Sequence, residues 1–85
     1  MTITYNGQTP SEFVTKFLSN FKSACKRNGL KFDNYSLKNF YLGAIKNFEC
    51  SMNLAHSNND KQFFEQCALI ALKKAEFYHN KIQGF

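Results

Sequence analysis

Apolar residues recur at steps of three and four along most of this chain, and that spacing is the strongest constraint on its fold. Such steps gather side chains on one face of an α-helix, which has 3.6 residues per turn. Three segments show the pattern, and polar breaks separate them. A chain of 85 residues holds a single domain. The predicted fold class is therefore all-α, an antiparallel three-helix bundle with a short extended N-terminal arm.

The first helix is predicted at residues 10–28. Thr9 as N-cap, Pro10 at the first helical position and Glu12 three residues after the cap form a capping box. Gly29 supplies the left-handed backbone with which many helices end. The apolar stripe of this segment is Phe13, Val14, Phe17, Leu18, Phe21, Ala24 and Cys25.

The second and third helices are predicted at residues 37–56 and 60–83. Ser36 is the expected N-cap of the second helix, and Gly84 is expected to end the third. Extra leucine and isoleucine residues widen the apolar arc of the third helix, so we expect it to contact both of the others or a second copy of the chain.

The arm is predicted at residues 1–8 and ends in a turn at Asn6–Gly7. Residues 9–85 are predicted to form the single helical domain. A helix-turn-helix arrangement is the competing architecture, but it favours shorter helices joined by tighter turns.

Composition restricts the class of protein. Eleven Lys and Arg residues against six Asp and Glu give a net charge of +5, which favours acidic or polyanionic partners. No apolar run is long enough to span a membrane, and no secretory signal begins the chain. Three cysteines without a paired spacing argue against a disulfide framework. We therefore expect a cytoplasmic protein without membrane association.

No catalytic, cofactor or metal site is predicted. The five cysteine and histidine residues are scattered, whereas a metal site needs three or four convergent ligands. Exposed Cys50 with His56 six residues later is a weak nucleophile pair. The glycines are isolated, so no phosphate-binding loop is present. A non-enzymatic role is the expectation.

Surface charge gives the candidate site. Helical geometry places several cations of the first helix opposite its phenylalanine stripe. Further lysines, beside aromatic residues, follow in the predicted linker, Leu30 to Tyr35, and just after it. Such surfaces contact phosphates and stack on nucleobases. The predicted partner or nucleic-acid contacts are Lys16, Lys22, Lys26, Arg27, Lys31, Phe32, Tyr35 and Lys38. Equally, outward lysines are often only solvated, and Phe32 then closes the end of the bundle. A smaller set, Lys73, Lys74 and Lys81, complements the dipole of the third helix.

Four apolar residues fall off the main stripes and are expected to form an exposed patch: Leu42, Phe63, Leu69 and Phe77. Exposed apolar patches mark partner surfaces or self-association. Homodimerisation through this patch is a further hypothesis.

The stretch from Phe48 to Phe85 has the break Asn58-Asn59-Asp60, an alanine-rich last helix and the ending Ile82-Gln83-Gly84-Phe85. In these features it resembles the helical hairpins of small phage-encoded anti-CRISPR proteins. The alternating alanine and aromatic residues between Ala44 and Tyr78 are equally similar to a tetratricopeptide-like hairpin. The first resemblance implies an inhibitor that occupies a nucleic-acid groove or an assembly surface of a host nuclease. A net charge of +5 disfavours DNA mimicry.

Two functions are therefore predicted. The first is a small basic binding protein from a phage or mobile element that sterically blocks a host nucleic-acid-handling machine, such as a CRISPR effector nuclease. Its partner is an acidic protein surface or a nucleoprotein complex, in the host cytoplasm. The alternative is direct RNA or DNA binding by the basic face of the first helix, as a monomer or a dimer.

Overall fold

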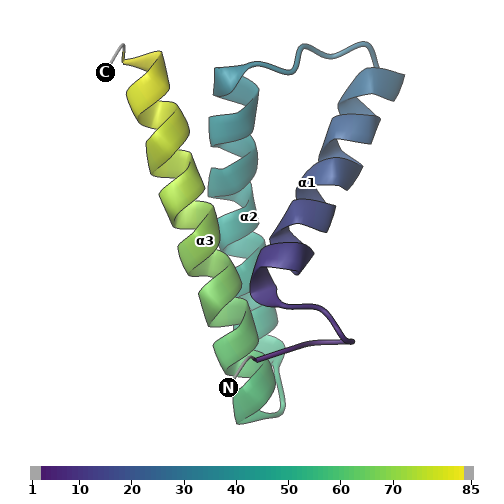
Figure 1. Ribbon diagram of the computed structural model, residues 1–85, viewed down its shortest axis with the longest axis vertical. Coiled ribbons are helices and arrows are strands. Elements are labelled where there is room, and N and C mark those ends of the chain that lie inside the picture. Colours follow the sequence, from purple (N-terminus) through teal and green to yellow (C-terminus); the bar gives the residue numbers. More distant parts are fainter. Residues whose placement is uncertain (1–2, 84–85) are drawn as a thin grey trace.

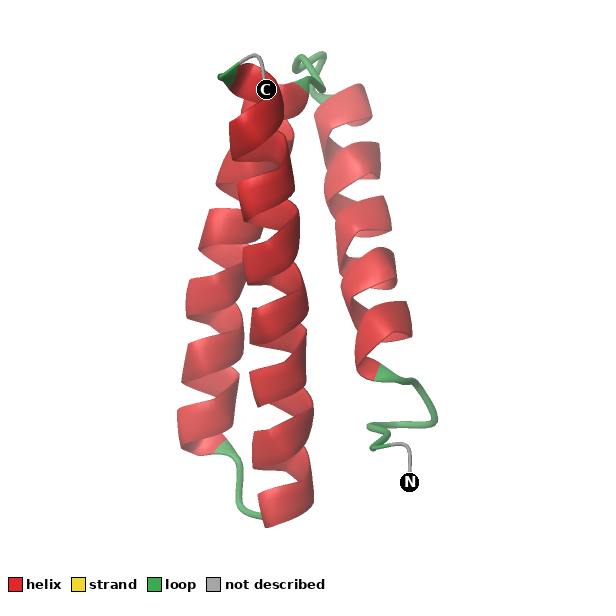
Figure 2. Cartoon of the chain, turned by 60° about the vertical axis from the view of Figure 1, so that its left-hand side comes forward, coloured by secondary structure: helices red, strands yellow, loops and turns green. Residues whose placement is uncertain are grey.

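Three helices make up most of the chain in the computed structural model, which describes residues 3–83. They are α1 (Pro10–Arg27), α2 (Asn34–Leu54) and α3 (Asn58–Ile82). Successive helices run in opposite directions, and only loops and turns join them (Figures 1 and 2). The all-α three-helix bundle predicted from the sequence is confirmed. No helix within residues 3–83 has the length and apolarity that crossing a bilayer requires.

The start and end of α1 follow from local chemistry. The Thr9 hydroxyl accepts a hydrogen bond from the Glu12 amide at 3.2 Å, and the Glu12 carboxylate accepts one from the Thr9 amide at 3.0 Å. This is the predicted capping box, which satisfies two amides that lack helical partners. After the helix, Gly29 has φ +67°, the left-handed conformation expected of it.

The second helix begins three residues earlier than predicted because Asp33, and not Ser36, is its N-cap. The Asp33 carboxylate accepts a hydrogen bond from the Ser36 amide at 2.9 Å. The Ser36 hydroxyl instead donates to the Lys31 carbonyl at 2.9 Å, which ties the linker to the first turn of α2. In the same way, Ser57 caps α3 by accepting from the Asp60 amide at 3.2 Å. His56 therefore lies outside both helices, and the predicted stop at Gly84 lies outside the described residues.

Helices α2 and α3 form a close pair, and α1 diverges from them toward the linker (Figure 1). The radius of gyration is 13.7 Å, above the roughly 12 Å expected for a compact domain of this length. The buried cluster has side chains from all three helices: Val14, Tyr41, Ala44, Phe48, Phe63, Phe64, Cys67, Ala71 and Ala75. Five of these nine residues belong to α3, which contacts both other helices as predicted.

Two kinds of contact attach α1 to the pair. At its beginning α1 lies close to α3, where the Cys67 sulfur is 3.9 Å from the Pro10 carbonyl oxygen. Farther along, phenylalanine rings reach across to α2. The ring centroids of Phe21 and Phe40 are 4.6 Å apart in a stacked arrangement, and those of Phe17 and Phe40 are 5.4 Å apart.

Residues 3–8, the described part of the predicted N-terminal arm, fold back on themselves and pack against the bundle, and residues 1–2 of that prediction lie outside the described residues. Tyr5 and Gln8 form an isolated antiparallel bridge across a turn in which Asn6 and Gly7 have φ of 52° and 78°. The Tyr5 ring lies 5.4 Å from that of Phe63 and 5.2 Å from that of Phe64, measured between centroids. The arm is thus part of the core's cover.

This packing corrects the prediction for Phe63. The sequence placed Phe63 in an exposed patch, but the side chain is 0% exposed. Tyr5 and Phe13 cover it, with the Phe13 ring centroid also 5.4 Å away. The periodicity of α3 alone could not reveal this, because the covering residues come from the arm and from α1.

Candidate functional site

The antiparallel topology gathers positive charge at one end of the bundle. At that end lie the C-terminal halves of α1 and α3, the linker and the N-terminal half of α2, with α1 and α3 on opposite sides of α2 (Figure 1). The described residues of this region include eight cations and only two carboxylates, Asp33 and Glu76, so their net charge is +6. We call this region the basic end, and its eight cations are Lys22, Lys26, Arg27, Lys31, Lys38, Lys73, Lys74 and Lys81.

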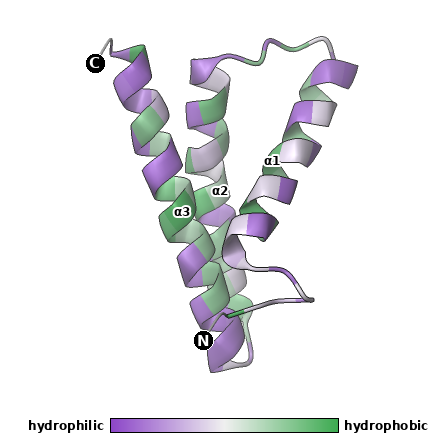
Figure 3. Cartoon of the chain, in the orientation of Figure 1, coloured by the Kyte–Doolittle hydropathy of each residue, from purple (hydrophilic) through white to green (hydrophobic). Residues whose placement is uncertain are grey.

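The opposite end of the bundle is nearly neutral. Its described residues include three lysines and four carboxylates, so their net charge is −1. The cations are Lys16, Lys46 and Lys61, and the carboxylates are Glu12, Glu49, Asp60 and Glu65. The whole net charge of +5 is therefore concentrated at the basic end, where it produces a directed positive field. Figure 3 shows hydrophilic residues at the ends of α1 and α2 next to the linker.

Helix dipoles account for part of this charge. Lys26 and Arg27 lie in the last turn of α1, and Lys81 lies in the last turn of α3. The negative end of each helix dipole stabilises cations there. Lys31 and Lys38, in contrast, lie near the N-terminus of α2, which is the positive end of its dipole. After the hydrogen bond from the Ser36 amide, Lys31 helps to lower the pKa of the Asp33 carboxyl, whereas the dipole of α2 gives no reason for Lys38.

Aromatic rings accompany the cations at the basic end. The Lys22 ammonium lies 5.6 Å from the Phe32 ring centroid, and the Lys81 ammonium lies 4.9 Å from that of Phe77. Phe32 is half-buried and its centroid is 6.0 Å from that of Phe21. Tyr35 is 61% exposed in the first turn of α2. An exposed ring beside cations can contact a planar or apolar group while the cations bind an anion.

Six of the eight predicted contacts lie in one stretch of chain at the basic end, and Lys22 and Phe32 are in contact with each other. The six are Lys22, Lys26, Arg27, Lys31, Phe32 and Tyr35. Lys16 lies apart from them, in a depression beside the arm that Asn6 and Gln8 also line. Lys38 is half-buried and lines a different depression, between α2 and α3.

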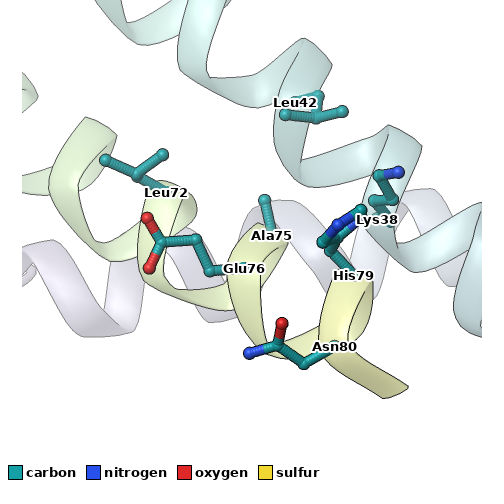
Figure 4. Close-up of a pocket in the computed structure, with 7 residues that line it drawn as sticks. All are labelled: Lys38, Leu42, Leu72, Ala75, Glu76, His79 and Asn80. Carbon is teal, nitrogen blue, oxygen red and sulfur yellow. The ribbon is translucent and has the colours of Figure 1, made fainter. Parts of the chain in front are cut away.

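That second depression has a volume of about 300 Å³ and is shown in Figure 4. Two leucines and an alanine provide apolar surface, and a lysine, a glutamate, a histidine and an asparagine supply polar groups. Such a lining suits an apolar group with a polar end. The residues are Lys38, Leu42, Leu72, Ala75, Glu76, His79 and Asn80.

Three members of the predicted apolar patch are exposed. Leu42, Leu69 and Phe77 have exposed fractions of 43%, 52% and 47%. Leu72, which the sequence analysis did not include, is 43% exposed beside Leu42. Homodimerisation through these side chains stays a prediction.

Four groups have shifted pKa values with identifiable causes, and one is Glu12, whose pKa is lowered by hydrogen bonds from the Thr9 amide and hydroxyl. The Ser36 amide bonded to its carboxylate lowers the pKa of Asp33, so that this acid of the basic end is engaged in capping. Burial, and then the neighbouring Tyr78, raise the pKa of Tyr41. Burial raises the pKa of the Cys67 thiol to about 11, which makes it a poor nucleophile.

Metal-binding residue types stay dispersed within residues 3–83, where no group of three His, Cys, Asp or Glu could hold an ion. Cys25, Cys50 and Cys67 are free thiols, and Cys50 is the exposed one. The pairing of Cys50 with His56 stays a prediction.

The lysines of α3 were not predicted to belong to the candidate site, but the topology places them at the same end of the bundle. Lys73, Lys74 and Lys81 lie in the half of α3 that ends beside the start of α2. The predicted topology already implied this arrangement. In an antiparallel three-helix bundle, the C-termini of the first and third helices lie at the same end as the N-terminus of the second.

The comparisons with protein-family models, curated protein sequences and solved structures gave no match to this chain.

Proposed function

We propose that this protein is a non-enzymatic binding protein that docks its basic end on an anionic partner. The observation that carries the proposal is the segregation of charge, +6 at one end against −1 at the other. A concentrated positive field raises the rate of encounter with polyanions and orients them. Lys38 strengthens the argument because the dipole of α2 does not favour a cation at its position.

The partner we propose is a host nucleic-acid-handling machine, such as a CRISPR effector nuclease, which a phage or mobile-element protein would block sterically. Such machines present both phosphates and acidic protein surfaces. The resemblance of residues 48–85 to phage-encoded inhibitors supports this choice. The proposal includes a cytoplasmic location, and the three free cysteines fit a reducing compartment.

Direct binding of RNA or DNA is the second candidate. The exposure of Tyr35 between Lys31 and Lys38 favours it, because a free aromatic ring among cations suits base stacking with phosphate contacts. This candidate needs no protein partner.

Two charge-matched triple variants test the basic end. Lys22→Glu/Lys26→Glu/Arg27→Glu alters it, and Lys16→Glu/Lys46→Glu/Lys61→Glu alters the opposite end. Each substitution removes a positive charge and adds a negative one, so both variants have the same net charge. On a heparin column the first variant should elute at much lower salt than the second. Equal elution of the two variants would remove the basic end as the binding surface.

A second measurement separates the two candidates. For direct nucleic-acid binding, log affinity for a generic RNA should fall with log salt by about 0.7 to 0.9 per neutralised phosphate. For docking on a protein machine, a bacterial partner should remain bound to the wild type after nuclease treatment of the lysate. The basic-end variant should fail to retain that partner, and the opposite-end variant should retain it. A partner released by nuclease would favour the nucleic-acid candidate.

A further inference from the structure

A groove runs between α1 and α2, and Lys31 is the one basic-end cation among the residues that line it. Two adjoining depressions, of about 450 and 500 Å³, form it. They share Phe21, Asn39 and Phe40 as lining residues, so they lie side by side. The lining comes from α1, α2 and the linker, and α3 does not contribute to it.

The floor of the groove is aromatic and its rim is polar. Phe21 and Phe40 are half-buried and stack on each other with an interplanar angle of 30°. Each of these two rings therefore has one face already covered. The rim carries amide side chains, from Asn20 on α1 and from Asn39 and Asn47 on α2. An apolar floor with uncharged hydrogen-bonding groups at its edges suits an amphipathic segment better than a stack of bases.

Gly43 lies in this groove, one helical turn from Asn39 and one from Asn47. It is in the interior of α2, where glycine is the least favourable residue after proline. A Cβ at this position would meet no atom within 4 Å, and its φ is not in the left-handed region. The fold therefore does not require glycine here. A missing side chain does let another backbone approach closely.

The charge of the groove restricts its occupant. None of the residues that line the two depressions is an aspartate or a glutamate. Lys31 lines the groove at the linker end, and Lys16 lines the next depression along α1, which shares Phe17 and Asn20 with the groove. The complementary segment has acidic residues along its edges.

We propose that the α1–α2 groove binds an acidic amphipathic helix of a partner protein. From Phe13 to Cys25 the three depressions follow α1 for about 18 Å at 1.5 Å per residue, the length of a helix of roughly 12 residues. Apolar side chains at steps of three and four would face the phenylalanine floor, and the backbone would approach at Gly43. The proposal shares Lys31 with the basic end but uses none of its other cations, so it can hold if that proposal fails.

Selection from a displayed library of helical 16-residue peptides tests this directly. We expect wild-type protein to enrich peptides with Leu, Ile or Phe at steps of three and four and Asp or Glu beside them. In ¹⁵N spectra these peptides should shift the Gly43 amide and the side-chain amides of Asn20, Asn39 and Asn47. Failure to enrich any peptide, enrichment of basic peptides, or shifts confined to other faces would overturn the proposal.

Substitution of Gly43 gives opposite effects on stability and binding. Gly43→Leu fills the groove but should raise Tm by about 4 to 8 °C, because leucine favours helix far more than glycine does. It should weaken peptide binding at least tenfold. Asn53→Leu adds the same side chain at an exposed position of α2 outside the groove and should leave binding unchanged. Unchanged binding to Gly43→Leu would overturn the proposal, as would stronger shifts of the same amides by a 16-residue oligothymidylate.

Discussion

The sulfur of Cys67, in the middle of the buried face of α3, lies 3.9 Å from the carbonyl oxygen of Pro10, the first residue of α1. This contact joins residues 57 positions apart and fixes where α1 begins against the helical pair. Cys67 is fully buried, and its surroundings raise its pKa to about 11. Its reactivity therefore reports on whether α1 stays docked.

We expect thiol reagents to distinguish exposed Cys50 from buried Cys67 at pH 8. Cys50 should react within seconds because it is exposed, whereas Cys67 should react only when the bundle opens. The measurement is release of chromophore from Ellman's reagent. Cys50→Ser should remove the fast phase. Rapid reaction in a Cys25→Ser/Cys50→Ser variant would show that α1 does not protect Cys67.

Phe63→Ala should lower the free energy of unfolding by about 3 to 5 kcal/mol, because the ring is fully buried and its removal leaves a cavity. Phe77→Ala removes the same ring from the same helix, but that ring is 47% exposed. We expect it to cost about 1 kcal/mol or less. Urea denaturation measures both, and equal losses would contradict the burial of Phe63 beneath the arm.

Thr9→Ala should cost about 1 kcal/mol of folding stability, because it removes the hydroxyl that accepts the Glu12 amide. Thr15→Ala is the matched control, since Thr15 is exposed within α1 and bonds only a carbonyl of its own helix. We expect that substitution to be neutral or slightly stabilising. A cap that is absent in solution would make the two variants equally stable.

Acid should weaken the fold through two capping carboxylates. Hydrogen bonds from the Thr9 backbone and side chain lower the pKa of Glu12, and the Ser36 amide lowers the pKa of Asp33. Because each folded pKa lies below its unfolded value, this stability is complete above about pH 5 and is lost as the pH falls through the folded values.

Thermal unfolding between pH 7 and pH 2 measures this loss. Glu12→Gln should lower Tm at pH 7 and flatten its decline below pH 4.5. Glu65→Gln removes an exposed carboxylate of α3 that caps no helix and should leave the decline as in the wild type. A decline that Glu12→Gln leaves unchanged would contradict a role for the capping box.

The sequence predicted which cations of one helix lie together, but it did not predict which cations other helices add to the same surface. Lys22, Lys26 and Arg27 share a helix, so their spacing places them together. Lys81 joins them only because α3 returns to the same end. The groove was not predicted either, although the isolated glycine at position 43 within a helical pattern was a signal for it.

Sequence by itself determined the helices, their inward faces and both ends of α1. The bonds of Thr9 with Glu12 and the left-handed Gly29 depend on residues within one helical turn, so local chemistry is enough to predict them. Even the shift of a cap from Ser36 to Asp33 is a choice between two local candidates.

Only the tertiary structure decided which surfaces meet. The arm covers Phe63 with Tyr5, and the phenylalanines of α1 reach α2 at a distance that leaves a groove. The cations of three segments lie at the same end of the bundle. These arrangements depend on contacts between residues far apart in the chain. Mutual burial and packing of these residues stabilise the arrangements. The periodicity of one segment does not predict which other segment it packs against.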